Sequence, residues 1–146
     1  MFKVIECEDV EIIKEIFREY SGTKGAESCF VSFEKELSDL NGYYKGGALL
    51  LGLEDDTPVG SVAIRKIDND YCEGKRLYIR PEYRGKGYAK IMLNSMIDKA
   101  KELGFREVRF TTKPDVMKVA YAWYKRLGYE ELGCSNGVVQ MKINLQ

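Results

Sequence analysis

The architecture of this chain follows from one stretch, Leu77-Tyr78-Ile79-Arg80-Pro81-Glu82-Tyr83-Arg84-Gly85-Lys86-Gly87-Tyr88-Ala89. It predicts an apolar strand, a turn closed by proline, a glycine-rich loop and the start of a helix. The first N–H groups of a helix have no partner within the helix, and the helix dipole is positive at the same end. The stretch is therefore typical of a phosphate-binding loop.

Two common phosphate-binding motifs do not fit this loop. A Walker A loop needs Gly-Lys followed by Ser or Thr, whereas Gly87 is followed by Tyr88 and Ala89. A dinucleotide fingerprint needs a third glycine, and Lys90 stands at that position. The pattern that remains is Arg-x-x-Gly-x-Ala, which begins at Arg84.

This pattern resembles the R/Q-x-x-G-x-G/A motif of the GCN5-related N-acetyltransferases, the GNAT family, with alanine at the last position. A second segment resembles the family's A-x-x-L-Y-x-x-x-G-F; it reads Ala120-Tyr121-Ala122-Trp123-Tyr124-Lys125-Arg126-Leu127-Gly128-Tyr129. Trp123 replaces the usual Leu, and Tyr129 replaces the usual Phe. The two motifs carry the resemblance over the C-terminal half of the chain, and the first half matches in its order of elements.

Hydrophobic periodicity and turn residues predict the order β-α-α-β-β-β-α-β-α-β-β. We expect strands at 2–6, 47–53, 59–67, 71–79, 107–111, 129–132 and 138–143, and helices at 10–20, 33–40, 87–103 and 114–127. The fold class is α/β (α+β), with a mixed, mostly antiparallel sheet and helices on both faces. We expect a single N-acetyltransferase domain over residues 1–146, and the resemblance implies that the fourth and fifth strands splay apart.

Composition limits the other functions open to the chain. Its 146 residues are 45% hydrophobic and 32% charged, with 23 basic and 23 acidic side chains. A net charge of zero does not favour nucleic acid or anionic lipid as a partner. No apolar run reaches the about 20 residues of a membrane span, and the N-terminus lacks the apolar core of a signal peptide. We expect a cytoplasmic protein that binds neither membrane nor nucleic acid.

The reactive side chains exclude several kinds of site. The four cysteines are scattered and the chain has no histidine, so we expect no metal site and mostly buried, reduced thiols. Without histidine, acid–base chemistry falls to Glu, Asp, Tyr, Lys or Cys. Cys72 is a weak candidate nucleophile because no histidine can activate it.

The resemblance implies acetyl-CoA (coenzyme A) as co-substrate. Residues Arg84, Gly85, Lys86, Gly87, Tyr88 and Ala89 would then hold its pyrophosphate. The backbone of Leu77, Tyr78 and Ile79 would pair with the pantetheine arm like an added strand. The N–H of Ile79 is our candidate for stabilising the oxyanion.

Glu73 is our candidate for the general base. The resemblance suggests it, because the histone acetyltransferase branch of the family has a glutamate near this place. Strand alternation predicts that Glu73 lies on the same face as Leu77 and Ile79. The alternative is a structural carboxylate paired with Lys75 or Arg76.

Tyr124 is the tyrosine of the second motif and our candidate for the general acid that protonates the departing thiolate. The alternative is that Tyr124, with Tyr121 and Trp123, is part of the core packing of an amphipathic helix.

The binding site for the acceptor amine follows only from analogy with the family. By that analogy, the site is lined by residues 21–45 and by the loop at 133–136. Phe30, Phe33, Tyr43 and Tyr44 are candidates for a wall, while Glu34 and Glu36 either meet a cationic amine or form a solvated acidic face. We expect the acceptor to be an amine of a small molecule or a peptide. Whether the protein forms a homodimer is left open. The alternative function is a non-catalytic acyl-CoA-binding or regulatory domain.

Overall fold

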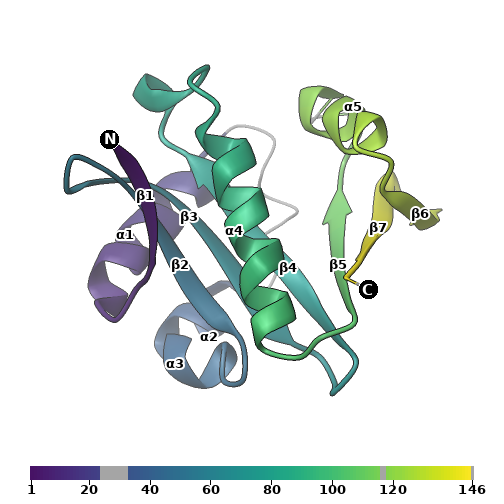
Figure 1. Ribbon diagram of the computed structural model, residues 1–146, viewed down its shortest axis with the longest axis horizontal. Helices are drawn as coiled ribbons and strands as arrows, with labels where there is room; N and C mark the ends of the chain where they lie inside the picture. The colour runs from purple at the N-terminus through teal and green to yellow at the C-terminus, as the bar shows by residue number, and fades with distance from the viewer. Residues whose placement is uncertain (24–32, 116–117, 146) are drawn as a thin grey trace.

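A computed structural model describes residues 1–23, 33–115 and 118–145 (Figure 1). Within them, the strands are β1 (Phe2–Glu6), β2 (Ala48–Glu54), β3 (Thr57–Lys66), β4 (Tyr71–Ile79), β5 (Glu107–Thr112), β6 (Glu130–Ser135) and β7 (Val138–Asn144). The helices are α1 (Val10–Ser21), α2 (Phe33–Ser38), α3 (Leu40–Tyr43), α4 (Tyr88–Glu102) and α5 (Lys118–Arg126), with a short 3₁₀ turn, η2 (Pro81–Tyr83). This order confirms the predicted succession of strands and helices, except that α2 and α3 stand where one helix was predicted.

The strands form one sheet in the order β1-β2-β3-β4-β5-β7-β6. Every neighbouring pair is antiparallel except β4 and β5, which are parallel. The β4–β5 ladder covers only Tyr71–Glu73 and Glu107–Arg109. Both strands continue beyond it, to Ile79 and Thr112, without pairing to each other. The predicted splay of the fourth and fifth strands is therefore confirmed.

Helices cover the two halves of the sheet unequally (Figure 1). In the half made by β1–β4, α4 packs on one face, and α1, α2 and α3 pack on the other. In the half made by β5, β7 and β6, Phe110 and Met141 point into the cluster formed with α4 and α5. Alternation turns Arg109, Thr111 and Gln140 to the opposite face, which no described helix covers.

The second predicted helix is in fact two short helices, because Asp39 interrupts it. Asp39 is the N-cap of α3, and its carboxylate accepts a hydrogen bond of 3.1 Å from the N–H of Gly42. A capping aspartate begins a new helix instead of continuing the old one. Gly42 consequently lies inside α3, beyond residue 40, where the sequence predicted that the helix ends. The start predicted for the last helix falls next to residues 116–117, which lie outside the described residues.

Strand β4 contains a bulge at Arg76, whose φ is 61°. Ser61 pairs with Tyr78 and Ala63 pairs with Lys75, so Arg76 and Leu77 together face one residue of β3. Such an extra residue reverses the alternation of the strand beyond it.

The bulge corrects the expected orientation of Glu73. Before the bulge, Gly74 faces α4, since a Cβ there would meet Met96; Glu73 faces the opposite way. After it, Leu77 and Ile79 pack on the α4 side. The prediction that Glu73 shares a face with Leu77 and Ile79 is therefore wrong.

Candidate active site

The glycine-rich loop forms an open cradle at the N-terminus of α4. Gly85 and Gly87 have φ values of 80° and 83°, in the left-handed region that favours glycine. Gly87 is the N-cap of α4 and makes no side-chain capping bond. A Cβ built on either glycine meets nothing within 4 Å. The first N–H groups of this 15-residue helix thus face an unobstructed space suited to an anion.

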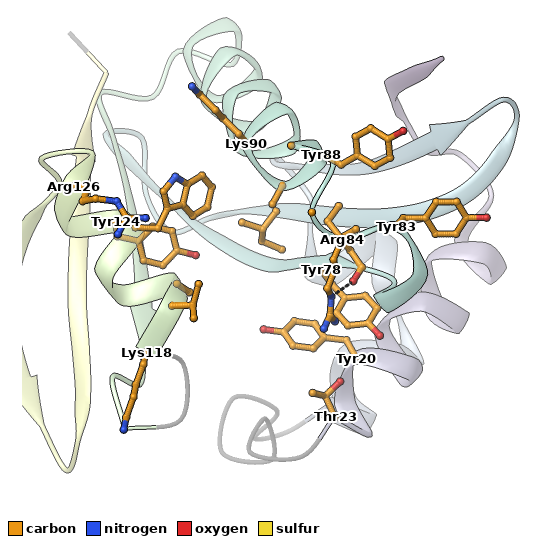
Figure 2. Close-up of a pocket in the computed structure, with 18 of the residues that line it drawn as sticks. Tyr20, Thr23, Tyr78, Tyr83, Arg84, Tyr88, Lys90, Lys118, Tyr124 and Arg126 are labelled. Atoms are coloured by element: carbon orange, nitrogen blue, oxygen red, sulfur yellow. Dashed lines mark hydrogen bonds between the residues drawn. The ribbon is translucent and has the colours of Figure 1, made fainter.

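A cavity of about 760 Å³ extends from this cradle to α5 (Figure 2). The predicted cofactor residues that line it are Leu77, Tyr78, Ile79, Arg84, Gly85, Gly87, Tyr88 and Ala89. Lys86 does not line it, because its Nζ lies 3.8 Å from Glu54 and 5.4 Å from the ring centre of Tyr83. The side chain of Lys86 is thereby directed away from the cradle, and only its backbone belongs to the loop.

The end of β4 presents backbone groups to this cavity. The N–H of Arg80 donates to the carbonyl of Val59 in β3 at 2.8 Å. Successive residues of a strand point their N–H and C=O groups to opposite sides, so those of Ile79 face the gap between β4 and β5. The Ile79 carbonyl accepts a hydrogen bond of 2.8 Å from Arg84 Nε. Arg84 therefore ties the loop to the strand.

A second cavity, of about 270 Å³, occupies the gap where β4 and β5 separate. Residues from both strands and from α4 line it, among them Glu73, Lys75, Arg76, Thr111 and Thr112. Three residues, Tyr20, Leu77 and Tyr124, line both cavities. The two cavities therefore meet at these residues.

Glu73 lies in the second cavity with 32% of its side chain exposed. Its Oε1 is 3.8 Å from Lys75 Nζ and 4.0 Å from an Arg65 nitrogen. The same oxygen is buried and accepts no hydrogen bond from the described residues. The pairing with Lys75 that we considered is thus present at long range, while Arg76 pairs elsewhere.

Tyr124 projects from α5 into the cavity, opposite Tyr20 from the end of α1 (Figure 2). Its ring packs edge-on against Phe110 at 4.7 Å. Burial raises the pKa of the Tyr124 hydroxyl above its ordinary value, and Tyr20 and Tyr129 add to the shift. The phenol therefore keeps its proton at neutral pH, as a general acid must.

Sequence reasoning missed several residues of the first cavity. Tyr20 and Thr23 come from the end of α1, and Lys90, Lys118 and Arg126 bring positive charge from α4 and α5. No local motif marks Tyr20, since only the tertiary packing of α1 brings it to β4. Lys118 lies two residues before the second motif and Arg126 lies within it, and this closeness to Tyr124 in the sequence is the one signal that pointed toward them.

The sequence suggested that Glu36 faces either solvent or a cationic acceptor, and the structure shows neither. It is 1% exposed and accepts hydrogen bonds from Arg76 Nη2 at 2.6 Å, Arg76 Nε at 3.1 Å and Tyr44 Oη at 2.7 Å. Tyr44 is buried as well, so it is not an acceptor wall. Phe33 lies under the Arg76 guanidinium, 5.6 Å from the ring centre. Phe30 falls outside the described residues.

Other expectations for the acceptor side also change. The loop at 133–136 belongs to β6 and its turn, at the edge of the sheet, and lines neither cavity. Tyr43 packs beneath Lys75 and Arg65, at 5.1 and 4.4 Å from its ring centre. Burial raises the pKa of the Cys72 thiol to about 12, which leaves it protonated and a poor nucleophile.

The described parts of the chain contain no group of three or more His, Cys, Asp or Glu side chains placed to hold a metal ion. The helices within residues 1–23, 33–115 and 118–145 include none that is long and apolar enough to span a membrane.

Comparison with known proteins gives concordant results. The sequence profile of the Acetyltransferase (GNAT) family matches residues 10–129. The uncharacterized N-acetyltransferase YjgM of Escherichia coli is 29% identical over 136 residues, which span 87% of this chain and 80% of that protein.

Solved structures agree in fold. The PaiA N-acetyltransferase of Thermoplasma acidophilum, in complex with coenzyme A, aligns with a TM-score of 0.77 at 21% identity and covers 99% of both chains. A GNAT-family acetyltransferase of Staphylococcus aureus aligns with a TM-score of 0.80 at 18% identity, over 100% of both chains.

Proposed function

Because the chain belongs to the GNAT family of acetyltransferases, we propose that it transfers an acetyl group from acetyl-CoA to a primary amine of a small molecule or peptide. The amine would attack directly, with both substrates bound at once. The observation that carries the proposal is the meeting of two cavities at Leu77 and Tyr124. One cavity, of about 760 Å³, contains the glycine-rich cradle for the cofactor's phosphates, and the other offers a carboxylate to the amine.

The chain's own residues fit coenzyme A in three places. The cradle at Gly85–Ala89 would hold the pyrophosphate through backbone N–H groups. The backbone N–H groups of Leu77 and Ile79, which point into the gap between β4 and β5, would pair with the pantetheine arm. Lys90, Lys118 and Arg126 would neutralise the remaining phosphate charge. When bound, acetyl-CoA supplies an activated acyl group with a thiolate as leaving group.

Three groups would serve the transfer itself. Glu73 Oε1, which accepts no hydrogen bond from the described residues, would take a proton from the attacking amine. The N–H of Ile79 would stabilise negative charge on the carbonyl oxygen. Tyr124, protonated at neutral pH, would donate a proton to the departing sulfur.

Two measurements test the proposal. Acetyl-CoA at 100 times its dissociation constant should stabilise the fold by about 2.7 kcal/mol, visible as a rise in melting temperature. A panel of primary amines should then release free thiol from acetyl-CoA. Binding without thiol release from any amine favours the alternative, a non-catalytic acyl-CoA-binding domain; absence of binding removes both. We also propose that the protein is cytoplasmic. A measurement of its mass in solution decides between a monomer and a homodimer.

A further inference from the structure

The bulge of β4 requires a left-handed backbone conformation, which the arginine at that position does not favour. Arg76 has a φ of 61°, which a glycine adopts freely and a long side chain adopts only when its surroundings impose it. The hydroxyl of Ser61 donates to the Arg76 carbonyl at 2.9 Å and fixes one side of the bulge. This bond holds the backbone of the bulge, but it does not explain why the residue at the bulge is arginine and not glycine.

The side chain of Arg76 is held by a buried network that reaches to α2 and α3. Arg76 and Glu36 are 6% and 1% exposed, and two of the guanidinium nitrogens donate to the carboxylate of Glu36 at 2.6 and 3.1 Å. Tyr44 donates to the same carboxylate at 2.7 Å. Replacing a buried ion pair by apolar residues is often neutral or stabilising, so stability alone is a weak explanation for the presence of this ion pair. Its effect on the backbone conformation of Arg76 is the stronger explanation.

The bulge determines which backbone groups face the gap between β4 and β5. Tyr78 pairs with Ser61, and Arg80 bonds to Val59, so the N–H groups of Leu77 and Ile79 point away from β3 and into the gap. Without the extra residue, the alternation before the bulge would continue. Arg76 and Tyr78 would then present their N–H groups to the gap, and the side chains of Leu77 and Ile79 would leave the α4 face.

We propose that Glu36 is a positioning residue, which acts through Arg76 to hold β4 in the register that points the Ile79 N–H at the acetyl carbonyl. This inference rests on the proposed acetyl transfer. Glu36 itself lines neither cavity. Its carboxylate holds the guanidinium, the guanidinium holds the left-handed backbone of Arg76, and that backbone sets the phase of the strand from Leu77 onward.

A double-mutant cycle tests this chain of effects. Glu36→Gln keeps the shape but removes the charge, so Arg76 can relax toward an ordinary φ. We expect kcat to fall between about tenfold and hundredfold, as displaced catalytic groups do. The dissociation constant for coenzyme A should rise about two- to tenfold, because pantetheine hydrogen bonds are lost.

Arg76→Gly provides the informative partner, because glycine adopts the bulge conformation without support. In the Arg76→Gly background, adding Glu36→Gln should change kcat and the coenzyme A dissociation constant by less than about twofold, a coupling that adjacent residues in one network can show. Equal losses from Glu36→Gln in both backgrounds would overturn the proposal.

A stability control separates positioning from simple destabilisation. Ile143→Ala removes buried volume from β7 and lines neither cavity, so it should lower the melting temperature with kcat intact when assayed well below that temperature. If Glu36→Gln behaves like Ile143→Ala, Glu36 is structural only and the proposal fails. If the parent binds coenzyme A but turns over no amine, the proposed transfer fails instead, and the coenzyme A affinities of the four cycle proteins still decide the role of Glu36.

Discussion

The two ends of the cleft are built by different means. The proposed cofactor end is centred on one continuous segment, residues 77–89, and the binding groups that we propose there are mostly backbone N–H groups at a helix start. The proposed acceptor end joins side chains from distant parts of the chain, such as Tyr20, Glu73 and Tyr124. A site made of backbone tolerates most side-chain changes and fails only where a glycine is lost. A site made of side chains depends on each charge and hydroxyl.

The largest effect on coenzyme A affinity should come from Gly87→Asp, because Gly87 belongs to the backbone cradle itself. The new side chain would place a Cβ and a negative charge in the open space before α4. We expect coenzyme A affinity to fall at least about hundredfold, the loss of several charge-assisted hydrogen bonds, as measured by calorimetry. The fold should persist.

Gly104→Asp is the matched control. Gly104 has a φ of 93° at the other end of the same helix, and a Cβ there also meets nothing within 4 Å. Its substitution carries the same backbone strain but lies away from the cradle, so coenzyme A should bind as in the parent. Equal losses in both variants would attribute the effect to strain instead of phosphate binding.

Tyr124→Phe should have the next largest effect, on rate alone. The ring and its contact with Phe110 stay, and only the hydroxyl is lost. We expect kcat to fall about hundredfold, the low end for a general acid, with coenzyme A affinity unchanged. Because the folded pKa of Tyr124 is raised, its acid form persists as pH rises, and parent activity should show no alkaline loss up to about pH 10, where an ordinary tyrosine ionises.

Tyr121→Phe serves as the control for this loss of a hydroxyl. Tyr121 lies on the same helix but donates its hydroxyl to Glu131, and it lines neither cavity. Its kcat should match the parent. An unchanged kcat in Tyr124→Phe, measured with a working amine at saturation, would assign Tyr124 to packing.

Glu73→Gln should lower kcat about tenfold, less than a typical general base contributes, because a water molecule can replace the carboxylate in this partly exposed position. Glu107→Gln is the comparison, since Glu107 binds Arg109 at 2.6 Å on the uncovered face of the sheet. We expect the two variants to differ in rate across the amine panel. A Glu73→Gln enzyme as fast as Glu107→Gln would exclude the carboxylate as the base.

The smallest effect should come from Lys118→Gln, a side-chain change at the backbone-built end. Lys118 lines the cofactor cavity from an exposed position on α5, where a single charge contributes about 1 kcal/mol or less. The dissociation constant for coenzyme A should rise about two- to threefold at low salt and less at high salt. A loss as large as that of Gly87→Asp would show that side-chain charge, not backbone, dominates this end.

The same division explains what the sequence could predict. Gly87 and Tyr124 belong to local motifs, in which the required geometry follows from neighbouring residues. The helix break at Asp39 and the burial of Glu36 depend on partners across the fold, and an acidic residue on a short helix gives no sign of a distant arginine. Arg76 is the hardest case, because a left-handed residue inside a strand is usually marked by glycine. Missing that bulge reversed the predicted face of Glu73.

The short ladder between β4 and β5 has a mechanical consequence. In the described chain, the backbones of the two halves of the sheet are joined at one end, by the pairs Tyr71–Glu107, Cys72–Val108 and Glu73–Arg109 and by a hydrogen bond of 2.7 Å from the Arg106 N–H to the Asp70 carbonyl. The separation of the unjoined strand ends can therefore vary without breaking a hydrogen bond elsewhere in the sheet. A molecule that bridges those ends with amides of its own makes the sheet continuous, and protects Ile79 from hydrogen exchange with the solvent.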